Sequence, residues 1–267
     1  MGSKQRVFVT RSECENETLD ILRDQDIDVE VNQEPGKCPP ELLKEKTQER
    51  SCWDSCILNV GYDHLDMDYI KSKGIIATYT PGAVSTSTAE TALTLILMVL
   101  KRVQESQSIM RTYYGSEAYF PPTWVRGNNL NKKVIGSILY TGKTGPKKDI
   151  DFARYCELDE LLSSSDIVII SCSLNSETTH FIDMKAFDQM KKTGIIINVA
   201  RGGIIQQDDL VQALQNKKIS GAGIDVMTPE PLERTNPLLN MPNVVVFPHI
   251  GTNTVETRLD MGKNSCR

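Results

Sequence analysis

The chain has no long apolar run and no excess of basic charge. Its longest apolar stretch, residues 91–100, contains ten residues, two of them threonine, whereas a helix needs about 20 apolar residues to cross a bilayer. Thirty Lys and Arg stand against 35 Asp and Glu, which gives a net charge of −5. Binding along DNA or RNA needs a basic surface that neutralises phosphates. The sequence therefore predicts neither a membrane protein nor a nucleic-acid-binding protein.

Cysteine and histidine are too scattered to indicate a disulfide framework or a metal site. The seven cysteines are odd in number, and the closely spaced pair, Cys52 and Cys56, has no histidine pair with it to complete a zinc site. The residues before Val7 contain no apolar signal core. These features favour reduced thiols, no bound metal and a cytoplasmic location.

Apolar residues form 39% of the 267 residues and charged residues 24%, which is enough to bury the cores of two domains. Short β-branched segments alternate with helical patterns from end to end. In the first part we expect strands over residues 6–10, 27–31 and 75–79, and helices over 15–23, from the prolines at 39–40, over 65–73 and over 85–103. Residues 115–131, with two prolines and two glycines, indicate an irregular loop.

From residue 133 onward, strands and helices alternate with short connections. We expect strands over 134–140, 166–171, 194–198, 221–226 and 244–247, and helices over 157–163, 184–191 and 207–216. Apolar strands separated by single helices are typical of a parallel sheet that is covered on both faces. The sequence therefore predicts an α/β fold, with a doubly wound parallel sheet over about 81–248 preceded by a smaller α/β unit.

Polar side chains follow three consecutive strands of this sheet. Arg201, Glu230 and His249 come after the strands 194–198, 221–226 and 244–247 in turn. Ligands of open parallel sheets bind beyond the carboxyl ends of the strands. A guanidinium binds a carboxylate through two parallel hydrogen bonds, and a histidine beside a carboxylate can hold and donate a proton. Together these residue types predict reduction of a 2-keto acid, whose carboxylate is anchored and whose carbonyl oxygen is protonated.

Each of the three residues also has a simpler interpretation when taken singly. Arg201 could anchor a loop at the surface, Glu230 could be a turn residue between prolines, and His249 could be a hydrogen-bonded loop histidine. Their occurrence at successive strand ends favours a catalytic site. The remaining histidines are weaker candidates, because His64 is typical of a helix start and His180 of a solvated polar turn.

Five segments of the chain form a recognisable set: NVGYDHLDM at 59–67, STAETALTLIL at 87–97, IINVARGGIIQQDDLVQAL at 196–214, ISGAGIDVMTPEPL at 219–232 and NPLLNMPNVVVFPHIGT at 236–252. They are similar to the D-isomer-specific 2-hydroxy acid dehydrogenase family, and within it to the glyoxylate/hydroxypyruvate reductase branch. The resemblance extends over nearly the whole chain, from Val7 to about Met261.

The resemblance implies a domain organisation and a set of site residues. Residues 1–80, to which 249–267 return, would form a flavodoxin-like substrate-binding domain, and 81–248 a Rossmann-like NAD(P)-binding domain. Arg201 would bind the substrate carboxylate, and His249 would donate the proton. Glu230 would be the carboxylate that holds the His249 side chain. Val60 and Gly61 would contact the substrate, and Thr88, Ser173, Val199, Asp225 and Gly251 would line the cofactor. A homodimer is also implied.

One element of the family's pattern is missing from the sequence. The glycine-rich fingerprint G-x-G-x-x-G does not occur, and the nine residues 134–142 stand where a strand, phosphate loop, helix and second strand need about 30. The resemblance suggests that residues 134–136 begin the first strand and 138–142 end the second. A second gap falls between Lys46 and Leu58. We therefore expect an incomplete Rossmann-like domain that lacks its phosphate loop.

Lys143 follows this junction. Residues 136–144 resemble a Walker A loop, but five residues separate the glycines where that motif has four. In NAD enzymes an acidic residue usually follows the second strand and binds the ribose hydroxyls, whereas a basic residue there favours the 2′-phosphate of NADP. Lys143 therefore favours NADP (NADPH) over NAD. Lys147 and Lys148 could help to bind the phosphate, although a solvated basic turn is an equally simple interpretation of them.

Two functions are compatible with the sequence. The first is NAD(P)H-dependent reduction of glyoxylate or hydroxypyruvate, and the retained Arg201, Glu230 and His249 favour it. The second is a catalytically impaired truncated isoform, or a non-catalytic scaffold of the same family, and the missing phosphate loop favours that.

Overall fold

The structure is a computed structural model that divides the chain into two compact units. It describes residues 6–9, 19–20, 23–24, 28–31, 33, 41, 55–56, 61, 66–72, 77–78, 80, 82–112, 125–130, 138–143, 145–148 and 150–265. One unit comprises Met1–Ser87 and Thr252–Arg267, and the other comprises Thr88–Gly251.

In its described residues, the first unit contains two pairs of parallel strands and the helices α3 (Met67–Ser72) and α9 (Val255–Ser265). Its strands are β1 (Arg6–Val9) paired with β2 (Asp28–Val31), and β3 (Ser55–Cys56) paired with β4 (Ala77–Thr78). Ile70 is the buried residue of α3. Asp66 caps the first turn of this helix, because its Oδ1 accepts a hydrogen bond from the Tyr69 amide at 2.9 Å. The expected helices over 15–23 and from 39–40 fall mainly on residues outside the described ranges.

The second unit is built on a four-stranded parallel sheet. The order across the sheet is β10 (Val244–Val246), β9 (Gly221–Ile224), β8 (Ile195–Asn198) and β7 (Ile167–Ile170). A separate parallel pair joins β5 (Ile138–Tyr140) to β6 (Ala153–Tyr155). The predicted α/β class with a parallel sheet is thus confirmed.

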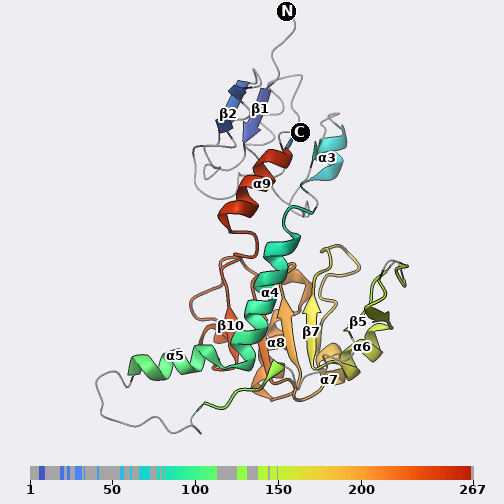
Figure 1. Cartoon of the computed structure of the whole chain (residues 1–267), viewed down its shortest axis with the longest axis vertical. Coiled ribbons are helices and arrows are strands. Elements are labelled where there is room, and N and C mark those ends of the chain that lie inside the picture. Colours follow the sequence, from blue (N-terminus) through green and yellow to red (C-terminus); the bar gives the residue numbers. More distant parts are fainter. Residues whose placement is uncertain are drawn as a thin grey trace, which may run out of the picture. The chain divides into compact units, whose positions relative to one another are not determined.

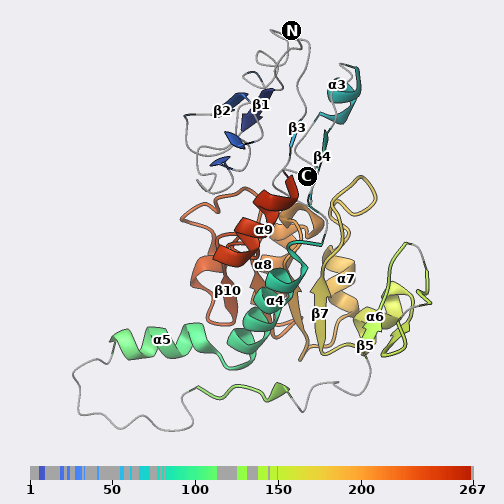
Figure 2. The same cartoon turned by 45° about the horizontal axis from the view of Figure 1, so that its top comes forward.

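Helices cover both faces of the four-stranded sheet. Figures 1 and 2 show α4 (Ser85–Leu100) along one face. Ile195 and Ile197 pack in the cluster that contains α4, whereas Ile196 packs in the opposite cluster with α6 (Leu158–Ser164), α7 (Met184–Gln189) and α8 (Gln207–Gln215). Successive strand residues point to opposite faces, so a strand buried on both faces is apolar throughout.

The structure corrects two expectations. The helix expected over 85–103 ends at Leu100, Arg102 has a left-handed φ of 55°, and a second helix, α5 (Val103–Thr112), follows. The Asn128 amide donates to the Leu100 carbonyl at 2.8 Å and so satisfies an oxygen at the end of α4. The strand β6 was not expected, because three residues between charged neighbours give little pattern.

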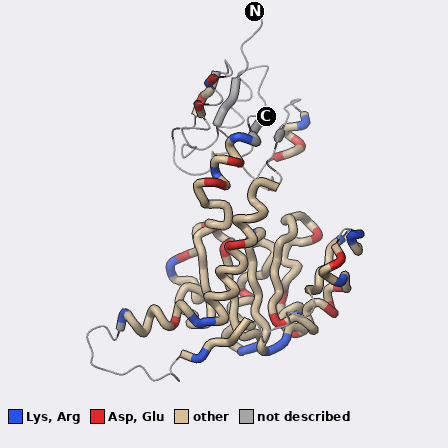
Figure 3. Tube along the Cα trace, viewed as in Figure 1, with Lys and Arg blue, Asp and Glu red and all other residues tan. Residues whose placement is uncertain are grey.

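Charged side chains of both signs are dispersed over the molecule. Figure 3 shows Lys and Arg interspersed with Asp and Glu along the described trace. Within the same part of the chain, no helix has the length and hydropathy needed to span a bilayer.

A substitution of Phe187 tests how much the apolar cluster between the sheet and the helices α6, α7 and α8 contributes to the stability of the second unit. The Phe187 side chain is fully buried, whereas nearby Phe181 is 44% exposed. Phe187→Ala is expected to lower the free energy of unfolding by about 3–5 kcal/mol, because it removes a buried ring and leaves a cavity. Phe181→Ala is the matched control and is expected to cost less than about 1 kcal/mol. Urea denaturation measures both, and equal losses would contradict the assigned core.

Candidate functional site

The loops that follow the four parallel strands meet at one edge of the sheet. Because β7, β8, β9 and β10 all run in the same direction, their carboxyl ends lie along that edge. Ser173, Arg201, Glu230 and His249 belong to the loops after these strands in turn. The topology thus gathers residues that are far apart in sequence.

The side chains of Glu230 and His249 are within hydrogen-bond distance of each other at this edge. His249 Nδ1 lies 3.0 Å from Glu230 Oε2, and the two side chains are 37% and 25% exposed. The other carboxylate oxygen, Oε1, accepts a hydrogen bond from the Met227 amide at 3.1 Å. An ionised carboxylate accepts hydrogen bonds and donates none, so Nδ1 carries a proton toward Glu230. The pair therefore fixes the orientation of the imidazole ring.

Asp225 holds the loop immediately after His249. Its buried carboxylate accepts hydrogen bonds from the amides of Ile250 and Gly251, both at 2.8 Å. His249 has a left-handed φ of 60°, which these bonds help to maintain. A Cβ at Gly251 would lie 2.8 Å from Asp225 Oδ2 and 3.9 Å from Thr88 Oγ1, so Thr88 on α4 is a close neighbour of this loop. Three predicted cofactor residues are thereby brought together.

The loop that carries Arg201 is held by a buried asparagine at the end of β8. Asn198 Oδ1 accepts from the Ala200 amide at 3.1 Å, and its Nδ2 donates to the Arg201 carbonyl at 2.9 Å. Arg201 Nη1 donates to the Ala200 carbonyl at 2.8 Å, which orients the guanidinium. A Cβ at Gly202 would overlap the carbonyl of Met227. The Arg201 loop therefore lies directly against the loop that carries Glu230.

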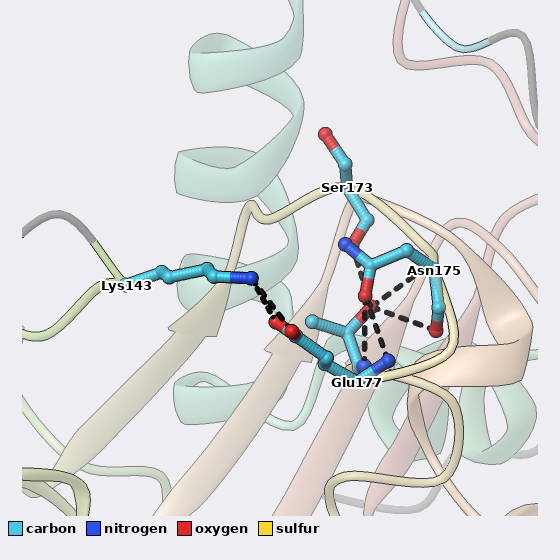
Figure 4. A network of polar contacts seen from close by, with 5 residues as sticks. Lys143, Ser173, Asn175 and Glu177 are labelled. Carbon is cyan, nitrogen blue, oxygen red and sulfur yellow. Dashed lines mark hydrogen bonds and ion pairs between the residues drawn. The ribbon is translucent and has the colours of Figure 1, made fainter.

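The turn after β7 brings Ser173 and Lys143 into one polar network, shown in Figure 4. Thr178 Oγ1 donates to the Ser173 carbonyl at 2.7 Å, and Asn175 Oδ1 accepts from the amides of Glu177 and Thr178 at 2.9 and 3.1 Å. Lys143 Nζ reaches both carboxylate oxygens of Glu177, at 2.6 and 2.5 Å. Both side chains of this pair are well exposed. Lys143 thus lies beside the Ser173 turn with its charge paired.

The remaining predicted residues are placed less closely. Val199 follows β8 and is half-buried, and its amide lies 3.4 Å from the Ile170 carbonyl. Gly61 is half-buried in the first unit, and Val60 lies outside the described residues. Desolvation raises the pKa of the Cys172 thiol, two residues after β7, which disfavours the thiolate.

Three residues that shape this site are not among those predicted from the sequence. They are Asn198, Glu177 and Gln207, whose amide binds the backbone of Thr228. Asn198 had a local signal, since an asparagine that ends an apolar strand often bonds to the backbone beyond it. Glu177 and Gln207 act on residues distant in sequence, and no local pattern marks them.

The edge fits one end of a nicotinamide dinucleotide better than the other. A carboxylate can accept about four hydrogen bonds, so Asp225 retains acceptor capacity for an amide group beyond its two backbone bonds. Pyrophosphate is usually held by a glycine-rich turn at a helix N-terminus. Residues 141–152, which join β5 to β6, contain no helix in their described part, and 131–137 lie outside the described ranges. Among the described residues, no three His, Cys, Asp or Glu side chains cluster as metal ligands.

Comparison with known proteins also indicates a domain that binds a nicotinamide cofactor. Residues 127–251 match the NAD-binding domain of D-isomer specific 2-hydroxyacid dehydrogenases. The mouse glyoxylate reductase/hydroxypyruvate reductase is 37% identical over 227 residues, which cover 76% of this chain and 69% of that protein. Glyoxylate/hydroxypyruvate reductase B of Pectobacterium carotovorum is 32% identical and covers 85% of this chain and 76% of its own length.

Solved structures agree with the fold. A Thermus thermophilus protein of 28% identity superimposes with a TM-score of 0.84 over 98% of this chain and 94% of its own. A glyoxylate/hydroxypyruvate reductase of Sinorhizobium meliloti, 24% identical, has the same fold with a TM-score of 0.83, covering 99% and 92% of the two chains. The resemblance of the five sequence segments is therefore confirmed. The chain belongs to the D-isomer specific 2-hydroxyacid dehydrogenase family of NAD(P)-dependent enzymes, in its glyoxylate/hydroxypyruvate reductase type.

Proposed function

We propose that the chain reduces a small 2-keto acid, glyoxylate or hydroxypyruvate, to the corresponding 2-hydroxy acid with NAD(P)H. The observation that carries this proposal is the contact between Glu230 and His249 at the carboxyl edge of the sheet, beside the Arg201 loop. Relatives named glyoxylate reductase/hydroxypyruvate reductase support the substrate class.

His249 is proposed as the proton donor. The cofactor, when bound, supplies a hydride to the carbonyl carbon, and the carbonyl oxygen then needs a proton. With Nδ1 directed at Glu230, the other ring nitrogen, Nε2, holds the proton that is transferred to that oxygen. Glu230 stabilises the positive charge of the imidazolium before the transfer and keeps the ring in place afterwards.

Arg201 is proposed to bind the substrate carboxylate through its planar guanidinium. Val60 and Gly61 would contact the substrate from the 1–80 domain, to which 249–267 return. The 81–248 domain would hold the cofactor. Within it we assign Thr88, Ser173, Val199, Asp225 and Gly251 to the lining of the cofactor site.

NADPH is the proposed donor, because Lys143 follows the second strand of the family's order. Its ion pair with Glu177 is exposed, and exposed pairs contribute at most about 1 kcal/mol, so a 2′-phosphate can compete for the lysine. We further propose that the protein is cytoplasmic, as its scattered cysteines favour, and that it forms a homodimer, as its family resemblance implies.

A second candidate is a catalytically impaired isoform or a non-catalytic scaffold of the same family. It is favoured by the absence of the G-x-G-x-x-G sequence and by the lack of a helix in the described part of 141–152. The two candidates make different predictions for cofactor affinity.

The first prediction concerns substrate binding. Arg201→Lys keeps the charge but loses one of the two parallel hydrogen bonds, each worth about 1.5–3 kcal/mol. The apparent KM for glyoxylate at fixed NADPH is therefore expected to rise roughly 10- to 100-fold. Arg234→Lys, at an exposed arginine in the loop after Glu230, is the matched control and leaves KM unchanged. An unaltered KM in Arg201→Lys would remove the arginine from substrate binding.

The second prediction concerns the proton donor. His249 and His180 both have left-handed backbones, with φ of 60° and 52°, which asparagine tolerates well. His249→Asn is expected to lower kcat by about 10²- to 10⁴-fold, the usual effect of losing a positioned general acid, with NADPH affinity unchanged. His180→Asn is expected to retain the parental kcat. Parental turnover by His249→Asn would refute its role.

The third prediction separates the two candidate functions. The chain is expected to bind NADPH at least about 100-fold more weakly than the mouse relative, because two or more charge-assisted bonds to pyrophosphate are lost. Calorimetric titration of both proteins measures the difference. Micromolar affinity, with NADPH oxidation on addition of glyoxylate, would show that the missing fingerprint is harmless. No oxidation at millimolar NADPH would favour the scaffold.

A further inference from the structure

Gln207 links two loops of the site without belonging to either. It is the first residue of α8, and η2 (Gly202–Ile204) connects it to the Arg201 loop. Its side-chain Nε2 donates to the Thr228 carbonyl at 2.7 Å, and its Oε1 accepts from the Thr228 amide at 3.1 Å. One amide group therefore satisfies both backbone polar groups of a residue in the Glu230 loop.

The Glu230 loop depends on such side-chain bonds for its shape. Pro229 and Pro231 have no amide hydrogen to donate. The Met227 amide is bonded to Glu230 Oε1, and the Thr228 amide to Gln207. With the other described residues, Met227 and Thr228 make no backbone–backbone hydrogen bond. Removing the Gln207 amide would leave Thr228 with no anchor of comparable geometry.

The consequences reach His249 through direct contacts. Thr228 lies between Met227 and Glu230, and Glu230 bonds to Met227 with one oxygen and faces His249 with the other. On the opposite side, Gly202 lies against the Met227 carbonyl. A displacement of Thr228 would therefore alter the position of Glu230 relative to both His249 and the Arg201 loop.

We propose that Gln207 is a positioning residue that fixes Glu230, and through it His249, relative to Arg201. The role rests on the proposed function, because it concerns the geometry of the same proton donor. Glutamine suits the role because the Thr228 backbone presents one donor and one acceptor, and the primary amide of glutamine presents their complement. Glutamate would place a second acceptor against the Thr228 carbonyl, and asparagine is shorter by one methylene.

The test compares Gln207→Met with Gln206→Met in the full chain. Methionine has a length similar to that of glutamine and makes no comparable hydrogen bond. The adjacent Gln206 is the matched control, because its identical side chain makes no capping hydrogen bond to α8. The chain has three histidines, so ring signals in an NMR spectrum are few, and the His249 signals are those lost in His249→Asn. Gln207→Met is expected to shift the His249 signals and leave those of His180 in place. Gln206→Met is expected to shift neither.

Unchanged His249 signals in a folded Gln207→Met protein would overturn the proposal. If that variant does not fold, Gln207→Glu takes its place, since it keeps the shape and the acceptor for the Thr228 amide. It is expected to shift the same signals, and unchanged signals would again refute the role.

Kinetics distinguish this proposal from the proposed function. With measurable turnover, Gln207→Met is expected to lower kcat about tenfold at an unaltered NADPH KM, whereas an unaltered kcat would overturn the positioning role. Shifted His249 signals in a chain that never reduces a keto acid would support the positioning role and contradict the proposed reaction.

Discussion

The common direction of β7, β8, β9 and β10 is the constraint on which the site depends. Helices cover both faces of this sheet, and strands buried in that way are apolar throughout and run parallel. Parallel strands deliver all their carboxyl ends to one edge, so Arg201, Glu230 and His249 reach the same region from separate stretches of sequence. The chemistry of the edge is thus a consequence of how the core is covered.

Buried polar groups at the strand ends hold the loops in place. Asn198 and Asp225 are both almost fully buried. Asn198 bonds to backbone groups of the loop after its own strand, β8, and Asp225 bonds to backbone amides of the loop after β10. An unpaired polar group there would cost free energy, so the loops are confined to conformations that satisfy these side chains. This confinement lets His249 keep a left-handed backbone next to Gly251.

The division of the strands into two sheets relates the fold to cofactor binding. In a doubly wound sheet of order 3-2-1-4-5-6, the first strand lies between the second and the fourth. Among the described residues, β5 and β6 form a separate parallel pair and β7 lies at the edge of the four-stranded sheet, so no described strand takes the first position of that order. The ion pair of Lys143 and Glu177 is a contact between these two parts. Among the described residues, the contact between Glu230 and His249 is well formed, whereas no helix directly follows β5 to hold a phosphate group.

The sequence by itself determined the elements from 166 to 247 and the positions of Arg201, Glu230 and His249 at strand ends, because periodicity and strand termination are local properties of the chain. The tertiary structure decided where α4 ends, since the amide that satisfies Leu100 comes from Asn128. It also decided the partners of Gln207 and Lys143, which lie 21 and 34 residues away. Contacts over such separations follow from the packing of whole elements, and no local pattern encodes them.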